Sequence, residues 1–136
     1  MKVVFTNGCF DILHRGHVEY LKDSRKLGDK LVVGINSDLS VKRLKGSNRP
    51  INNQEDRAYL INALECVDEV YIFDEDTPYE LIKRIQPDII TKGGDYTLET
   101  VVGNDLANVV IMNIKEGYST TNIIEGIQNE KDIANR

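Results

Sequence analysis

Residues 6–17, read TNGCFDILHRGH, decide the fold of this chain. The apolar run at 3–5 precedes them and suits a short buried strand. After them, apolar residues recur at helical spacing between Val18 and Leu27. The sequence therefore predicts a strand, a glycine-bearing turn and a helix in succession. Such a turn directs backbone N–H groups and the positive end of the helix dipole toward one point, which suits an anion.

Two histidines, His14 and His17, flank Gly16 at the start of this helix. A lone histidine is more often structural, but a pair at such a turn can donate N–H groups to phosphate oxygens. Gly16 lacks the Cβ that would hold a phosphate away from the backbone. Cys9 has no base and orienting group at triad spacing, so nothing indicates a covalent route. Direct displacement between two phosphates needs only positioning and charge neutralisation, and this is the chemistry we expect.

Length and composition describe one ordinary globular domain. The chain has 136 residues, a net charge of −5, 40% hydrophobic and 29% charged residues. The negative charge argues against a nucleic-acid partner. We expect no membrane partner either, since no apolar run approaches the ~20 residues of a span and polar residues interrupt the start as a signal peptide. Cys9 and Cys66 suit free thiols in a reducing cytoplasm, so a cytoplasmic protein is expected.

The rest of the chain alternates strand-like and helix-like stretches. Further strands are expected at 31–35, 70–73, 88–91 and 109–112. Helices are expected to begin near Asn53, at Pro78 behind a Thr77 cap, and at Asn122. The pattern predicts an α/β fold, with a single Rossmann-like domain, a five-stranded parallel sheet and helices on both faces. This domain spans 1–128, and 129–136 form a polar C-terminal tail.

Polar groups gather where the predicted strands end, and in parallel sheets these carboxyl ends share one edge. Asn36 and Asp38 follow the second strand, and a basic segment at 42–49 hangs beside them as a loop. This segment either meets an anionic substrate or is simply a solvated loop. The glycine pair at 92–96 forms a third polar turn. Arg57, on an otherwise apolar helix stripe, is either a buried ion pair or a ligand contact.

A fourth polar stretch, GYSTT at 117–121, precedes the last apolar helix. Its hydroxyl residues either cap that helix or present hydroxyl and N–H groups to a triphosphate.

Two of these motifs together resemble a known family. GCFDILHRGH at 8–17 resembles the HxGH signature of the nucleotidyltransferase superfamily that contains the cytidylyltransferases, and GYSTT resembles its second signature. The similarity extends from residue 2 to about 128. The stretches TNGCFDILHRGHVEYL, NSDLSVKRLKGSNRP and KGGDYTLETVVG look like the adenylyltransferase domains of bacterial ADP-heptose synthases. Those domains act on D-glycero-β-D-manno-heptose 1-phosphate and are often fused behind a sugar kinase.

The resemblance implies three groups of site residues. The catalytic group, which stabilises the transition state, would be His14, His17 and Lys45. The nucleotide would contact Thr6, Asn7, Gly8, Cys9, Phe10, Gly16, Lys92, Gly94, Asp95, Glu116, Gly117, Tyr118, Ser119, Thr120 and Thr121. The sugar phosphate would contact Asp11, Asn36, Asp38, Lys42 and Arg57. Magnesium would bind mainly through the nucleotide phosphates, with no metal ligand from the protein, and Asp11 is expected to be a structural hydrogen-bonding residue rather than a metal ligand.

The resemblance also implies an activity and partners. We expect ATP and the heptose 1-phosphate to give ADP-heptose, a precursor of surface lipopolysaccharide, and pyrophosphate. A rival within the superfamily is a cytidylyltransferase that makes a CDP-polyol such as CDP-glycerol. A rival of another class is a nucleotide-binding module without catalysis. A homodimer and a separate heptose kinase are the expected protein partners. The stretch 102–116 is shorter than is usual in the superfamily, so only a turn is expected before the last strand.

Overall fold

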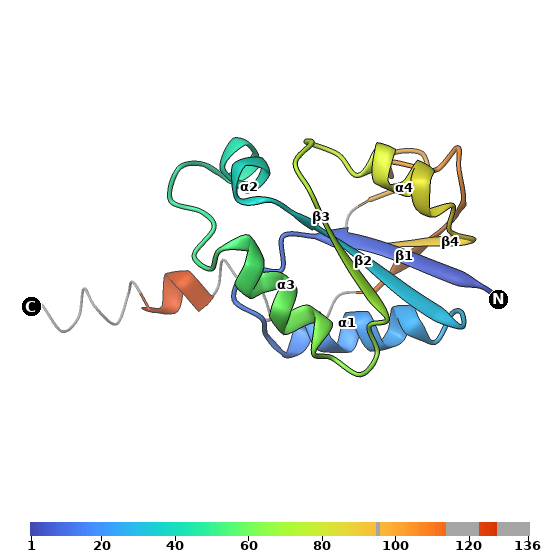
Figure 1. Cartoon of the computed structure of the whole chain (residues 1–136), viewed down its shortest axis with the longest axis horizontal. Coiled ribbons are helices and arrows are strands. Elements are labelled where there is room, and N and C mark those ends of the chain that lie inside the picture. The colour runs from blue at the N-terminus through green and yellow to red at the C-terminus, as the bar shows by residue number, and fades with distance from the viewer. Residues whose placement is uncertain (95, 114–122, 128–136) are drawn as a thin grey trace, which may run out of the picture.

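A parallel sheet forms the centre of the molecule (Figure 1). The structure is a computed structural model that describes residues 1–94, 96–113 and 123–127. The strands are β1 (Val3–Gly8), β2 (Lys30–Asn36), β3 (Glu69–Phe73), β4 (Ile89–Gly93) and β5 (Asn108–Met112). They lie in the order β3-β2-β1-β4-β5, and every neighbouring pair is parallel. The predicted five-stranded parallel sheet is confirmed.

Helices cover both faces of this sheet, as predicted (Figure 1). They are α1 (Arg15–Arg25), α2 (Asp38–Lys45), α3 (Gln54–Asn62) and α4 (Tyr79–Ile85). Successive strand residues point to opposite faces, so β1 contributes to two cores. Val4 packs with Leu21 of α1 and Ile61 of α3, whereas Phe5 packs with Leu81 of α4.

The two neighbours of β1 pair with it to different extents. Register with β2 runs along the whole strand, from Val3 to Gly8, whereas register with β4 covers only Val4 and Phe5. The order of strands also reverses between β1 and β4, because the chain leaves β1 toward β2 and later returns to β4. In open α/β sheets, the ligand crevice lies at the carboxyl ends of the strands beside such a reversal.

Three local predictions have different outcomes. The basic segment was expected to be a loop, but 38–45 form helix α2, because Ser37 caps it and accepts the Ser40 N–H at 3.2 Å. Pro78 is the residue before α4 rather than its first helical residue. The expected turn before the last strand is confirmed, since 98–106 hold turns and a bend. The predicted tail at 129–136 lies outside the described residues.

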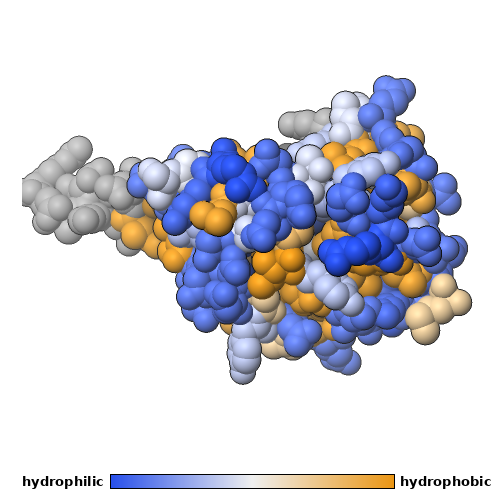
Figure 2. Space-filling view, turned by 45° about the horizontal axis from the view of Figure 1, so that its top comes forward, coloured by the Kyte–Doolittle hydropathy of each residue, from blue (hydrophilic) through white to orange (hydrophobic). Residues whose placement is uncertain are grey.

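The surface carries hydrophilic side chains interspersed with apolar patches (Figure 2). Exposed apolar side chains include Leu39 on α2 and Tyr59 on α3. Within 1–94, 96–113 and 123–127, no helix is both long and apolar enough to cross a bilayer.

Candidate active site

The two histidines form a stacked pair at the start of α1. Their ring centroids lie 3.7 Å apart with an interplanar angle of 22°. His14 is the N-cap residue, and its backbone N–H donates to Nδ1 of His17 at 3.2 Å. A neutral imidazole that accepts at Nδ1 carries its hydrogen on Nε2. His17 is therefore held as an N–H donor next to the positive end of the helix dipole.

The turn before the pair packs against the His17 ring. Phe10 and Ile12 have φ values of 48° and 51°, in the left-handed region that non-glycine residues rarely adopt. The Phe10 ring is buried and meets the His17 ring edge-on, with centroids 5.4 Å apart. A Cβ on Gly8 would lie only 3.0 Å from the Phe10 ring, which explains the glycine. The Phe10 side chain thus packs against His17, and its contact with the nucleotide stays a prediction.

Both imidazoles are neutral at pH 7. The pKa of His17 is lowered to about 4, mainly by burial and also by the neighbouring His14, while Asp11 opposes the shift. Burial also lowers the pKa of His14. Lys45 adds to the lowering at His17, which places this ammonium group within electrostatic reach of the pair. Of the three residues predicted to be catalytic, His14 and His17 are stacked on each other, and Lys45 is exposed on α2.

Asp11 holds a loop instead of facing a substrate. Its buried carboxylate accepts the backbone N–H groups of Ile51 at 2.7 Å and Asn52 at 2.9 Å, and Nε of Arg49 at 3.3 Å. Burial alone would raise the pKa of Asp11, but these hydrogen bonds outweigh it and the pKa is lowered. The predicted contact of Asp11 with the sugar phosphate is replaced by this structural role.

Arg57 is likewise inside the protein, with no exposed surface. Its guanidinium donates to three carbonyl oxygens, those of Cys9 at 2.7 Å, Asn36 at 2.8 Å and Asn52 at 2.9 Å. Nη2 also donates to the Asp38 carboxylate at 2.9 Å. Of the two alternatives for Arg57, the structure shows the buried ion pair, and the predicted substrate contact is wrong because every side of the guanidinium faces protein.

Two other residues predicted to contact ligands form hydrogen bonds inside the protein instead. The Asn36 side chain is buried and donates to Ser40 Oγ at 3.0 Å. Thr6 is completely buried, and its hydroxyl donates to the carbonyl oxygen of Thr91 at 3.2 Å. Neither side chain is open to a ligand, in contrast to the sequence prediction. Asp38 is half-buried, and its carboxylate accepts a hydrogen bond from Arg57.

Across the reversal point, the end of β4 presents Lys92 to the same turn. The Lys92 Nζ lies 4.7 Å from the centroid of the Tyr96 ring. Burial lowers the pKa of Lys92, and the Cys9 thiol opposes this shift. Burial raises the pKa of Cys9, and Lys45 is the strongest of the cations that oppose it. Lys45 of α2 and Lys92 of β4 therefore both interact electrostatically with Cys9 in the turn after β1.

The basic side chains of α2 divide into two groups. Arg43 turns toward the connection after β3, where its Nε pairs with Asp76 at 2.8 Å and Nη2 donates to the Asp74 carbonyl oxygen. Lys42 and Lys45 are exposed and form no ion pair with any described residue. Asn7, Gly8 and Gly16 are half-buried beside the histidine pair, and Gly94 follows β4. The predicted contacts Asp95 and Glu116, Gly117, Tyr118, Ser119, Thr120 and Thr121 lie outside the described residues.

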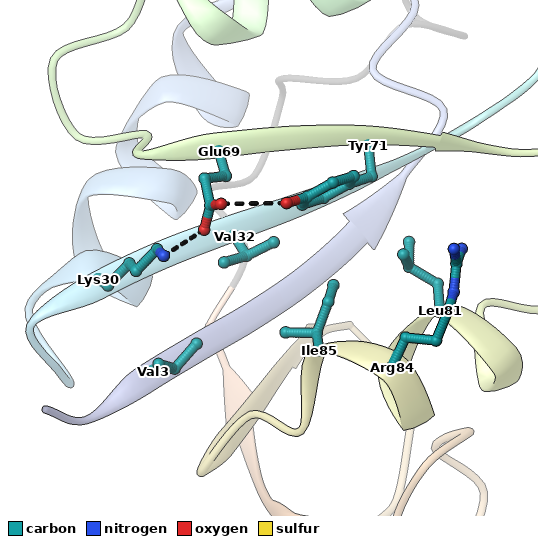
Figure 3. A pocket seen from close by; sticks show the side chains of 8 residues that line it. All are labelled: Val3, Lys30, Val32, Glu69, Tyr71, Leu81, Arg84 and Ile85. Carbon is teal, nitrogen blue, oxygen red and sulfur yellow. Dashed lines mark hydrogen bonds and ion pairs between the residues drawn. The ribbon is translucent and has the colours of Figure 1, made fainter.

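A separate hollow of about 380 Å³ opens on the α4 face of the sheet (Figure 3). Its lining comes from the starts of β1, β2 and β3 and from α4: Val3, Lys30, Val32, Glu69, Tyr71, Leu81, Arg84 and Ile85. Lys30 pairs with Glu69 at its edge. The hollow lies at the amino ends of the strands, away from the histidines, and contains no predicted site residue. As for metals, the described part of the chain brings no three His, Cys, Asp or Glu side chains together.

A Rossmann-like sheet with an HxGH turn at its reversal point defines a cytidylyltransferase-like protein. The Cytidylyltransferase-like family model matches residues 5–126, and the chain belongs to this family.

Among its relatives, the chain is 63% identical over 125 residues to the bifunctional protein HldE of a Nitratiruptor species, covering 91% of this chain and 27% of that protein. It is 55% identical to the HldE protein of Helicobacter pylori, covering 93% and 28% respectively. The chain thus spans little more than a quarter of the length of these relatives.

Two solved structures are similar to this chain. A lipopolysaccharide core biosynthesis protein from Thermoplasma volcanium is 37% identical, with a TM-score of 0.70, over 88% of this chain and 99% of that one. Pantothenate synthetase from Thermus thermophilus, at 18% identity and a TM-score of 0.59 over 83% of this chain and 56% of that one, shares the fold alone.

Replacing Arg57 by Met tests its role in holding the site together. We expect Arg57→Met to lower the free energy of unfolding by about 3 kcal/mol or more, since it leaves three carbonyl oxygens and a carboxylate without their donor. Arg43→Met, which removes an exposed ion pair, should cost less than about 1 kcal/mol. Urea denaturation measures both. Equal, small losses would show that the buried guanidinium is dispensable.

The depressed pKa of His17 predicts a pH dependence. NMR titration of the His17 ring should give a midpoint near 4 instead of the usual value of about 6.5. Between these two values the unfolded chain binds more protons than the folded one. The contribution of His17 to the free energy of unfolding is therefore fully present above about pH 6.5 and is lost as the pH falls toward 4. His17→Gln should remove this part of the pH dependence. An ordinary midpoint near 6.5 in the native protein would contradict the burial argument.

Proposed function

We propose that this protein is an adenylyltransferase that joins ATP and D-glycero-β-D-manno-heptose 1-phosphate to give ADP-heptose and pyrophosphate. Its family membership and its identity to HldE proteins support this activity. The likeness to a lipopolysaccharide core biosynthesis protein supports a role in making surface heptose precursors. The observation that carries the proposal is the stacked, neutral histidine pair at the N-terminus of α1, with Lys45 in electrostatic reach.

The reaction we propose is a direct in-line displacement. An oxygen of the sugar 1-phosphate attacks the α-phosphorus of ATP. The new P–O bond forms as the bond from the α-phosphorus to the α–β bridging oxygen breaks, and pyrophosphate leaves with that electron pair. The attacking phosphate is already an anion at neutral pH, so no general base is needed. The protein has to align the two phosphates and stabilise the charge that develops.

His14 and His17 are suited to the second task. Neutral imidazole N–H groups donate to phosphate oxygens without having to lose a proton first. Preorganised donors of this kind contribute ~3–4 kcal/mol each when they act on the transition state. Lys45, on the exposed side of α2, would neutralise the α-phosphate and the acceptor phosphate, with Lys42 beside it. Residues 117–121, outside the described part of the chain, would hold the β- and γ-phosphates.

Magnesium fits this proposal as an ion carried by the nucleotide. The Asp11 carboxylate is buried and already accepts three hydrogen bonds, so it is not available as a ligand. When bound to the phosphates, the ion would supply charge neutralisation. The predicted homodimer, separate heptose kinase and cytoplasmic location belong to this proposal as well.

A panel of substrates tests the activity. The protein with magnesium should release pyrophosphate from ATP when D-glycero-β-D-manno-heptose 1-phosphate is supplied, and much more slowly from CTP or GTP. Glycerol 3-phosphate in place of the heptose phosphate is the matched acceptor control. Turnover confined to CTP with glycerol 3-phosphate would replace this proposal by the CDP-polyol hypothesis.

His17→Ala separates catalysis from simple nucleotide binding. We expect turnover to fall ~10²-fold or more, because the variant loses a donor aimed at the developing charge. The Kd for ATP, measured by calorimetry, should change far less. Arg43→Ala, which alters α2 on the side facing Asp76, should leave both quantities near those of the parent protein. An equal loss of binding and rate would indicate uniform ground-state contacts and favour a binding module.

A further inference from the structure

Four largely buried hydroxyl groups connect α1 with β1 and β4, and we call them the hydroxyl cluster: Thr6, Tyr20, Ser24 and Thr91. Tyr20 Oη lies 2.9 Å from Thr6 Oγ1 and donates to Thr91 Oγ1 at 3.2 Å. Ser24 Oγ lies 2.9 Å from Thr91 Oγ1. Thr6, Ser24 and Thr91 have no exposed surface. Of these four residues, only Thr6 was predicted to contact the nucleotide.

The cluster stands where the pairing of β1 with β4 stops. Phe5 and Ile90 form the last registered pair, and Thr6 and Thr91 are the next residues of the two strands. There the Thr6 hydroxyl donates to the Thr91 carbonyl oxygen at 3.2 Å. Side-chain hydrogen bonds thus join the strands at the point from which they lead to opposite sides of the crevice.

Hydroxyl groups impose a more definite geometry here than apolar side chains would. A buried hydroxyl that loses its hydrogen-bond partner destabilises the folded state, so a small displacement of α1 against the sheet is unfavourable. Hydrogen-bonded networks in a low-dielectric interior also strengthen one another. Aliphatic side chains would hold the same elements together without fixing their relative position.

The cluster connects directly to the candidate site on both sides. Tyr20 comes three residues after His17 and Ser24 seven residues after it, so all three lie along one side of α1. Thr91 is followed immediately by Lys92 in β4. The hydroxyl cluster therefore joins the helix that carries His17 to the strand that carries Lys92.

We propose that the hydroxyl cluster is a positioning device for the transfer reaction, with Tyr20 and Thr91 as positioning residues that set the separation between His17 and Lys92. This inference rests on the proposed function. It assigns a role to residues that do not touch the substrates.

Paired substitutions test the cluster. Thr91→Val keeps the shape but removes the hydroxyl, Thr91→Ser keeps the hydroxyl, and Tyr20→Phe removes only the phenolic oxygen. We expect Thr91→Val and Tyr20→Phe to lower kcat about tenfold or more, with the KM for ATP changed about twofold at most, because small misplacements reduce the rate of an aligned displacement. Thr91→Ser should restore most of kcat. The control far from the cluster is Tyr79→Phe, because the hydroxyl of Tyr79, on α4, donates to Asp105 at 2.8 Å.

A second readout does not depend on activity. The His17 ring resonances in NMR should move in Thr91→Val and Tyr20→Phe and stay in place in Thr91→Ser and Tyr79→Phe. Parent-like kcat and unmoved His17 resonances in the first two variants would overturn the inference. A decrease of kcat in Thr91→Ser as large as in Thr91→Val would also overturn it, because the effect would then come from packing. If the parent protein turns over no nucleotide at all, the proposed function fails, and the resonances alone decide whether the cluster positions His17.

Discussion

The site depends on one buried charge, the guanidinium of Arg57. A cation without solvent needs acceptors on all sides, and Arg57 finds them in the turn after β1, the end of β2, the first residue of α2 and the loop before α3. The turn after β1, the junction of β2 with α2 and the loop before α3 are thereby fixed around one planar group. Asp11 repeats the arrangement with opposite charge, since its carboxylate gathers the backbone of the same loop. These two residues hold the histidine turn and the basic helix in one relative position.

Around this framework the electrostatics are local. The protein carries a net charge of −5, yet Lys45 and Lys92 both interact electrostatically with Cys9 in the turn after β1, which leads into the amino end of α1. Burial keeps the histidines neutral, so they contribute N–H donors without adding to the positive charge that the lysines already supply. An anion at this turn would meet local positive charge, although the net charge of the molecule is negative.

Sequence reasoning was most successful where structure is local. The strand, turn and helix around the HxGH motif, the later strands and the N-cap of α3 at Asn53 follow from patterns that span a few residues. It was least successful for polar residues near the motif. Asp11 and Thr6 were assigned to ligand contacts, and Arg57 was left between a ligand contact and a buried ion pair. All three lie in the interior, because the same residue types serve as buried hydrogen-bonding groups and as ligand contacts in a sequence. Helix α2 was missed, although Ser37 before Asp38 is an ordinary capping signal.

The sequence by itself determined the class of fold, the place of the histidine pair and the family to which the motifs point. Each of these depends on side chains that are neighbours along the chain or repeat with the period of a helix or strand. Only the tertiary structure decided which polar groups are buried, where β1 and β4 part, and that Tyr20 meets Thr91, 71 residues away. Contacts of that kind depend on the order of strands in the whole sheet. The helix or strand periodicity of neighbouring residues cannot predict them.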